Sequence, residues 1–466
     1  MRKKTSKIQT SNYLGIVDVV VSASLCLLIV SLFSFFLIST ATAQQVANDS
    51  QKPARLDAKT KSVIIDSVTS ALNEVYVFPE IAAEIERLVR SNLEKGTYKK
   101  ITSLPEFTNK LTQDLQSVSK DRHLRVRALP PGEAEQRDQL SPEDQRKQEL
   151  ARLKHKNFGF KKIELLAGNI GYVDFRFFAD ASLGGATAIA AMNFIAHADA
   201  IIFDLRGNGG GSPSMIQLIS SYLFEEPVHL NSFYIRKSDE MKQFWTQSWI
   251  EGNKMVDVPV FVLTSSYTFS GAEEFTYNLK NMKRGTIIGE TTGGGAHPVN
   301  RRIFKELNIA MSLPFGRAVN PITKTNWEGT GVEPDIKVSS DQALIVARIE
   351  ALKALNKNEP DESKKEQISW ILQGLEAEQK DIKIDPDTFK DYEGTYGPRK
   401  IWQENGKFYY QREGRPIYEL TPMGNDAFIV KGLDYFRMKF KRDISGAVVE
   451  LIGMYDNGDT DSNKRN

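Results

Sequence analysis

The sequence predicts an α/β protein in which a helical segment precedes the α/β core and a small antiparallel β domain follows it. Apolar residues recur at helical spacing through residues 57–120. Short apolar runs alternate with helical stretches in residues 161–340, and short strand-like runs separated by turn signals occupy residues 386–460. Alternating strands and helices are typical of a sheet covered by helices, so the middle segment is expected to hold the main core.

The composition is that of an ordinary soluble protein of two or three domains. Of the 466 residues, 41% are hydrophobic and 26% are charged, and the formal net charge is +2. The basic residues are scattered along the chain and are not gathered into patches with aromatic residues. This pattern argues against a nucleic-acid partner.

Residues 1–43 have the pattern of an export signal. Basic residues at positions 2–4 and 7 precede an apolar run over residues 19–38, and Ala41 and Ala43 form a small-x-small cleavage pattern. The apolar run is also long enough to span a membrane, so a retained inner-membrane anchor is the alternative. In both cases the body of the protein is expected to be exported, to the periplasm or another extracytoplasmic compartment.

The single cysteine, Cys26, lies inside that apolar run and follows Leu25, where a lipoprotein signal would need a small residue. The exported part therefore contains no disulfide, no cysteine nucleophile and no cysteine-based metal site.

Residues 57–120 show three helical stripes that predict a small helical bundle. Residues 121–160 follow as a strand-like motif and a charged connector, in which Glu, Gln, Lys and Arg predominate. The motif contains His123 at the change from helical spacing to alternation. A lone histidine at such a junction is usually a surface residue, so its position alone does not assign it a role.

The core segment, residues 161–340, opens with predicted strands at residues 170–177 and 200–205 and a predicted helix at residues 186–198. The second strand runs into a glycine-rich turn at residues 207–211. Such turns often hold phosphates, which makes a nucleotide site the competing interpretation. The sequence contains neither the P-loop pattern nor the dinucleotide-binding glycine pattern.

Ser270 stands where a buried strand, residues 260–263, gives way to helical spacing. A hydroxyl at a strand-to-helix corner lies beside the free N–H groups of the helix N-terminus, which can stabilise an oxyanion. The competing interpretation is structural, because Ser270 and Glu273 also form the Ser-x-x-Glu capping box that begins many helices.

Four pieces of the sequence together resemble the tail-specific and tricorn-like serine peptidases, the family of the C-terminal processing proteases and the interphotoreceptor retinoid-binding protein. They are residues 121–124 (DRHL), residues 204–211 (DLRGNGGG), the segment around Ser270, and residues 328–335 (EGTGVEPD). The matches cover residues 57–338. The resemblance implies a crotonase-like core of the ClpP type and a serine-type peptidase acting on peptides or proteins.

The resemblance also separates two branches of the family. The serine–lysine branch places its lysine in a glycine-rich loop after the serine, at the position that Gly295 occupies here. Lys280 does not replace it, because it lies about three helical turns beyond Ser270. The resemblance therefore implies a histidine base, with His123 as the candidate and His297 as the alternative.

In this branch Ser270 is the implied nucleophile, and the N–H groups of Gly210 and Gly271 are the implied oxyanion donors, with Gly209 close behind. Glu328 is the implied charge-relay acid. The family couples that acid to the base through a serine beside the histidine, and here Arg122 takes the serine's place. The implied chemistry needs no metal or cofactor.

The remaining segments are expected to support the core. Residues 130–156 are too few and too polar for the PDZ module that the tail-specific branch often carries. Residues 341–385 are predicted to be a helical connector, and Asn405-Gly406 is a typical hairpin signal within the C-terminal β domain. Two other functions remain open: a non-catalytic binder of hydrophobic ligands, and a cell-envelope interaction protein that acts through its β domain.

Overall fold

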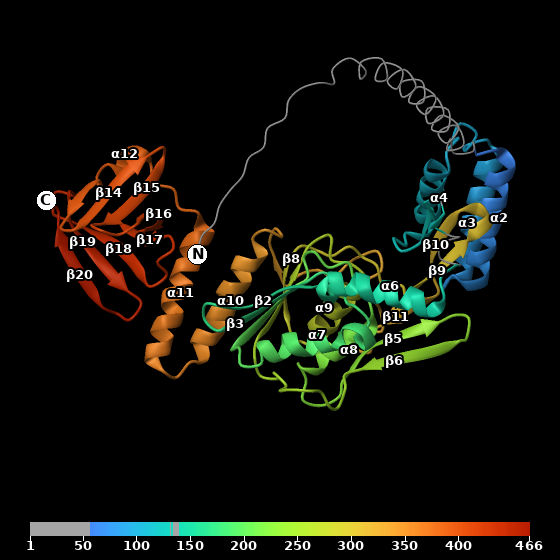
Figure 1. Cartoon of the computed structure of the whole chain (residues 1–466), viewed down its shortest axis with the longest axis horizontal. Helices are drawn as coiled ribbons and strands as arrows, with labels where there is room; N and C mark the ends of the chain where they lie inside the picture. The colour runs from blue at the N-terminus through green and yellow to red at the C-terminus, as the bar shows by residue number, and fades with distance from the viewer. Residues whose placement is uncertain (1–55, 131, 134–138) are drawn as a thin grey trace, which may run out of the picture.

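The computed structural model describes residues 56–130, 132–133 and 139–466, and three parts follow one another along its longest axis (Figure 1). The N-terminal helices lie at one end, the α/β core in the middle and a β domain at the other end. The predicted signal peptide or anchor, residues 1–43, lies outside the described residues. Within the described ranges, no helix combines the length and apolar character that crossing a membrane requires.

The N-terminal part is a bundle of α2 (Ala58–Val75), α3 (Pro79–Glu94) and α4 (Leu104–Ser119). Its interior is formed by the apolar stripes that the sequence shows, and Leu124 and Val126 pack into the same cluster. Strand β1 (Arg125–Ala128) follows the bundle directly. The motif that contains His123 is therefore held between the bundle and this strand.

A three-stranded antiparallel sheet joins the bundle to the core. β1 pairs with β10 (Ile309–Pro314), and β10 pairs with β9 (Val299–Phe304). Ile309, Met311 and Leu313 of β10 are buried against the bundle. This pairing brings the start of the chain beside a segment that follows Ser270 in the sequence.

The connector after β1 contains α6 (Pro142–His155) and the short 3-10 helix η1 (Asn157–Gly159). Of the residues in α6, Leu153 alone is buried. Its charged side chains otherwise face solvent, as a polar connector requires.

The core is built on a six-stranded sheet with the order β12-β8-β7-β4-β3-β2. All neighbours in it are parallel except β2, which pairs antiparallel with β3. The strands are β2 (Phe160–Leu166), β3 (Ile170–Phe175), β4 (Ala200–Asp204), β7 (Val260–Thr264), β8 (Thr286–Gly289) and β12 (Ile336–Lys337). Every residue of β3, β4 and β7 is buried, as expected for parallel strands covered on both faces.

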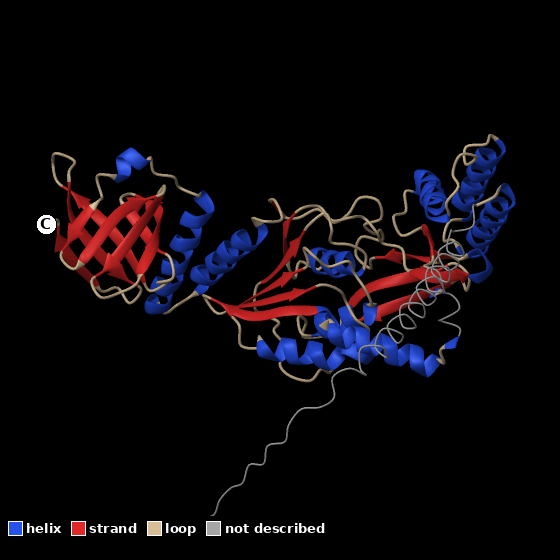
Figure 2. Cartoon of the chain, turned by 45° about the horizontal axis from the view of Figure 1, so that its top comes forward, coloured by secondary structure: helices blue, strands red, loops and turns tan. Residues whose placement is uncertain are grey.

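Helices cover the two faces of this sheet (Figure 2). α7 (Ala181–Phe194), α8 (Pro213–Ser221) and α9 (Gly271–Asn281) pack on one face with Ile201 and Phe203. α10 (Ala343–Asn358) and α11 (Glu362–Lys380) pack on the other with Ala200 and Ile202. Successive residues of β4 alternate between the two cores, because side chains alternate along a strand.

Helix α7 begins five residues before the predicted start and ends before the predicted end, so the prediction of residues 186–198 was wrong at both ends. The side chain of Asp180 caps the helix by accepting the Ser182 N–H at 2.9 Å. The two glycines that precede the predicted start, Gly184 and Gly185, are both buried inside the helix. A local N-cap outweighs the weak helix propensity of glycine here.

A second three-stranded sheet, in the order β11-β5-β6, lies beside the N-terminal end of α9. Its strands are β5 (His229–Ile235), β6 (Glu240–Trp245) and β11 (Gly316–Val319). Phe233 and Phe244 from the paired strands meet edge to face, with ring centroids 4.8 Å apart. This pair forms an aromatic wall near the predicted nucleophile.

The C-terminal part follows the short helix α12 (Pro386–Phe389) and is an eight-stranded antiparallel sheet in sequence order. Its strands are β13 (Gly394–Tyr396), β14 (Arg399–Glu404), β15 (Lys407–Arg412), β16 (Ile417–Gly424), β17 (Ala427–Val430), β18 (Phe436–Arg442), β19 (Val448–Tyr455) and β20 (Thr460–Lys464). An antiparallel bridge connects Tyr396 in β13, the first strand, to Arg465, the residue after β20. The two edges of the sheet therefore meet, and the sheet has a barrel-like form. Asn405 and Gly406 both have positive φ, which confirms the predicted hairpin turn.

The fold class predicted from the sequence is confirmed: an α/β core, a helical bundle before it and an antiparallel β domain after it.

Candidate active site

Ser270 lies at the corner between strand β7 and helix α9, as predicted. Its backbone has φ 55° and ψ −122°, a conformation that a residue with a side chain rarely adopts. Such a conformation costs on the order of 1–3 kcal/mol and persists only where the surroundings hold it. Ser270 is half-buried and lines two cavities.

Glu273 holds this corner in place. Its carboxylate is fully buried and accepts the N–H of Ser270 at 2.8 Å. It also accepts the N–H groups of Gly294 and Gly295, at 2.6 and 2.8 Å, and the hydroxyl of Thr292. The capping interpretation of Glu273 is therefore correct in part, and the same carboxylate ties the glycine-rich loop to the Ser270 corner.

His123 reaches this corner from the junction between α4 and β1. Its ring packs on Phe269, the residue before Ser270, with ring centroids 4.6 Å apart. His123 and Ser270 line the same cavity of about 590 Å³. The side chain is 8% exposed, and neither ring nitrogen has a hydrogen-bond partner among the residues that the structure describes.

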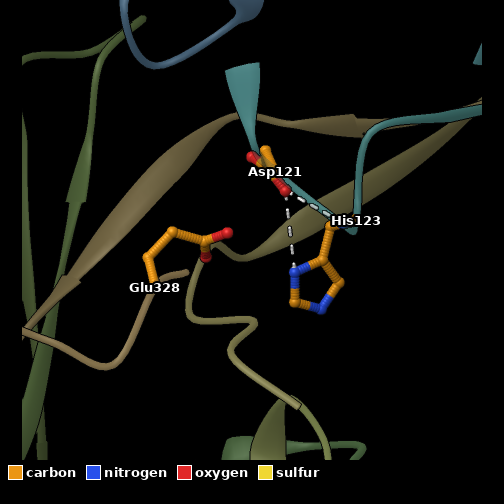
Figure 3. A group of neighbouring side chains, drawn as sticks. All are labelled: Asp121, His123 and Glu328. Carbon is orange, nitrogen blue, oxygen red and sulfur yellow. Dashed lines mark hydrogen bonds and ion pairs between the residues drawn. The ribbon is translucent and has the colours of Figure 1, made fainter. Parts of the chain in front are cut away.

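Asp121, two residues earlier, joins both histidines of the region. One of its carboxylate oxygens accepts the His123 backbone N–H at 2.9 Å and lies 4.0 Å from Nδ1 of that ring (Figure 3). The other lies 2.7 Å from Nδ1 of His297 and accepts the Tyr76 hydroxyl at 3.3 Å. Asp121 is fully buried, so these contacts are shielded from solvent.

Glu328 lies on the other side of this group (Figure 3). One of its oxygens accepts the backbone N–H groups of Ala296 and His297 and lies 3.5 Å from Nδ1 of His297. Arg122, which replaces the family's serine, points elsewhere and donates to the Gly293 carbonyl at 2.6 Å. Glu328 thus contacts the loop that carries His297.

The charges in this network follow from burial and from Asp121. Burial lowers the pKa of the His123 imidazole to about 4, although Asp121 favours its protonation. Burial also opposes protonation of His297, but the hydrogen bond and charge of Asp121 outweigh it and raise the His297 pKa. Burial raises the pKa of Glu328 to about 7, and the Asp121 charge adds to this. At neutral pH the network therefore places an uncharged His123 next to the hydrogen-bonded pair of Asp121 and His297, whose contact favours the charged form of both groups.

The glycine-rich turn after β4 lies against the Ser270 corner. The N–H of Gly210, the predicted oxyanion donor, instead donates to the side chain of Asn208 at 2.8 Å, and the Gly209 N–H donates to the Arg176 carbonyl. In this structure the Gly210 N–H is therefore not available to an oxyanion, because the Asn208 amide oxygen already accepts it.

The N–H groups of Gly211 and Gly271 have no acceptor within the described part of the chain. They are close together, since a Cβ added to Gly271 would lie 2.9 Å from the Gly211 nitrogen. Gly211 has φ +141°, and a Cβ there would lie 2.1 Å from the Phe178 carbonyl oxygen. The position therefore requires glycine, and the three-glycine run in the sequence did not indicate which N–H is free.

Three side chains of the network have the composition of a metal site. One ligand atom each of Asp121, His123 and Glu328 lie within 4.8 Å of one another. Both oxygens of Asp121, however, already contact donors of the protein. A proton network accounts for this cluster without a cation.

Two residues of the site were missed by reasoning from the sequence. Asp121 was noticed only as part of the motif around His123, and Glu273 only as a helix cap. The signal for Asp121 was an acid two residues before the candidate base. The signal for Glu273 could not be read locally, because the groups it binds come from residues 292–295.

A serine in a strained strand-to-helix corner, free N–H groups beside it and a buried neutral imidazole on the same cavity are the groups that a serine hydrolase needs. Comparison with protein families specifies the class. Residues 169–338 match the model of peptidase family S41, and residues 43–158 match the N-terminal domain of peptidase S41 in eukaryotic IRBP. The chain belongs to peptidase family S41 and is a serine-type peptidase, which acts on peptides or proteins.

Solved structures show more distant likenesses. The photosystem II D1 C-terminal processing protease is 14% identical, with 60% of this chain and 94% of that chain covered at a TM-score of 0.40. A lipoprotein from Streptococcus agalactiae is 17% identical, with 64% and 96% covered at a TM-score of 0.42. The tricorn protease is 12% identical, with 68% and 37% covered at a TM-score of 0.38.

Proposed function

We propose that the chain is an exported serine peptidase in which Ser270 is the nucleophile and His123 the general base. The observation that carries the proposal is the buried, uncharged imidazole of His123, which has two free ring nitrogens and shares a cavity with the Ser270 hydroxyl. A base must be unprotonated to accept a proton, and burial keeps His123 so at neutral pH. Export follows from the basic and apolar pattern of residues 1–43.

In the proposed reaction the Ser270 oxygen attacks the scissile carbonyl carbon while its proton passes to Nε2 of His123. The carbonyl oxygen becomes an oxyanion and accepts hydrogen bonds from Gly271 and Gly211, the two free N–H groups. The imidazolium then protonates the leaving amine, and an acyl-enzyme remains. Water, deprotonated by His123, releases the acyl group and regenerates Ser270.

Asp121 is proposed as the acid that orients His123. Its oxygen lies on the Nδ1 side of the ring, so Nε2 remains for Ser270. The carboxylate favours the imidazolium that forms during the reaction. Glu328 is proposed to act on His123 indirectly, because it contacts His297 and His297 pairs with Asp121. This route replaces the missing serine at position 122.

Two assays test this proposal. A fluorophosphonate probe, which reacts with activated serines, measures labelling of Ser270, and hydrolysis of peptides measures turnover. Wild-type protein is expected to label and Ser270→Ala is expected not to label, whereas Ser266→Ala, an exposed serine on the same cavity, should label normally. His123→Ala should lower turnover by orders of magnitude with substrate binding retained. Labelling that survives in Ser270→Ala, or comparable turnover in His123→Ala, would contradict the proposal.

The same assay separates the enzyme from the two other functions considered for the chain. A folded protein that neither labels nor cleaves any peptide would favour a binder of hydrophobic ligands or an envelope interaction protein.

A further inference from the structure

Glu274 lies on α9 beyond Ser270, at the spacing that places two helical residues on the same face. Ser270, Gly271 and Glu274 line a second cavity of about 600 Å³, which borders Ser270 and does not include His123 among its lining residues. Glu274 is 3% exposed. The Glu274 side chain and the proposed nucleophile, Ser270, therefore line the same cavity.

Among the described residues, no ion pair involves the Glu274 carboxyl group, and the one side chain that interacts with it is the amide of Asn231. Asn231 of β5 is also buried, and no group other than Glu274 is near enough to satisfy its amide within the described part of the chain. Burial raises the pKa of Glu274 to about 8, opposed only by the Asn231 side chain. A buried acid whose one neighbouring polar side chain is a neutral amide is costly to ionise, and such a group is rarely found without a function.

The other charged groups on this cavity do not neutralise Glu274. Lys242 is exposed and its ammonium lies over the Phe244 ring, 5.4 Å from the centroid. Asp180 accepts hydrogen bonds from the Ser182, Ser212 and Ser214 side chains or backbone at the start of α7. His297 is paired with Asp121. Asp180 is thus satisfied by serine hydroxyl and backbone N–H groups, and within the described part of the chain Glu274 is the acid on this cavity that has neither such donors nor a cation.

The direction of the substrate follows from the proposed function, on which this inference rests. The leaving amine must receive its proton from His123, so it lies toward the 590 Å³ cavity. The residue on the acyl side of the scissile bond then extends into the 600 Å³ cavity. We infer that Glu274 selects a basic residue, lysine or arginine, immediately before the scissile bond.

The dimensions and walls of the cavity suit such a side chain. One helical turn separates Glu274 from Ser270, about 6 Å along the axis, which an extended lysine or arginine spans. Phe233, Phe244 and Trp327 line the same cavity and offer apolar surface to the aliphatic stem. The cation then meets a carboxylate at the depth of Glu274, and the pair satisfies both groups.

The experiment compares fluorogenic peptides that differ only in the residue before the scissile bond: lysine, arginine, norleucine and glutamate. Norleucine has the stem of lysine without its charge. We expect kcat/KM to be about tenfold to a hundredfold higher for lysine and arginine than for norleucine, the range for a hydrogen bond to a charged group. Glu274→Gln should bring the lysine to norleucine ratio close to one, and Glu274→Asp should retain part of the preference.

Glu333→Gln is the matched control, because Glu333 is an exposed acid outside both cavities and the replacement is the same Glu-to-Gln change. The control should keep the wild-type ratio. Equal or better cleavage after norleucine or glutamate by wild-type protein, or an unchanged ratio in Glu274→Gln, would overturn the inference.

Fluorophosphonate labelling of each preparation distinguishes the two levels of the hypothesis. Normal labelling of Ser270 with a preference for norleucine would overturn the role of Glu274 and leave the peptidase proposal intact. Absence of labelling and of all cleavage would overturn the peptidase proposal and this inference with it.

Discussion

Replacing Glu274 by glutamine should stabilise the core increasingly as the pH rises. The carboxyl group is 3% exposed, and burial raises its pKa from 4.5 to about 8. The unfolded chain therefore ionises this acid at lower pH than the folded chain does. Ionisation of Glu274 therefore lowers the free energy of unfolding of the wild-type protein. This loss is close to zero below pH 4.5, is about 3 kcal/mol at pH 7, and reaches about 5 kcal/mol above pH 8.

The free energy of unfolding of wild type and Glu274→Gln would be measured by urea denaturation at pH 4.5, 7 and 8, with tryptophan fluorescence as the signal. The difference between the two proteins isolates Glu274, because all other titrating groups are shared. We expect the variant to gain about 3 kcal/mol relative to wild type between pH 4.5 and pH 7. A difference that does not change with pH would show that burial does not raise the Glu274 pKa and would refute this reasoning.

The remaining predictions concern the base and its surroundings. The acidic limb of kcat/KM should lie below pH 6.5 and toward pH 4, because burial lowers the His123 pKa to about 4 and the base must be neutral; a limb at or above pH 6.5 would contradict this. Gly295→Ala should lower kcat more than about tenfold, since the new Cβ would lie 2.7 Å from Cε1 of His123, whereas Gly185→Ala, with only ordinary contacts, should not. Asp121→Asn should lower kcat by about two orders of magnitude and shift the His297 titration, followed by NMR, to lower pH. Treatment with EDTA should leave turnover unchanged, and a loss restored by a divalent cation would instead identify a metal at the Asp121 cluster.

The strand, the helix and the hairpin turn discussed below could be predicted from the sequence, because patterns of a few neighbouring residues determine them. A buried strand followed by helical spacing located the Ser270 corner, and the Asn-Gly pair located a hairpin turn that the structure has. His123 could not be assigned from its own surroundings. The resemblance of the DRHL motif pointed to it, and the structure places it on the same cavity as Ser270.

Other features depend on which groups meet in space. The choice between Gly210 and Gly211 depends on Asn208, whose side chain accepts one N–H and leaves the other free. Likewise the capping role of Glu273 is local, but its bonds to the glycine loop arise only when that loop folds back onto α9.

By itself the sequence determined the strands, the helices, the serine at the corner and the family to which the chain belongs, since periodicity, capping and motifs act over a few residues. Only the tertiary structure decided the pKa values of the buried groups and the two cavities that border Ser270. Burial and charge pairing set the pKa of His123, Glu274 and Glu328, and both depend on residues far apart in the chain that packing brings into contact.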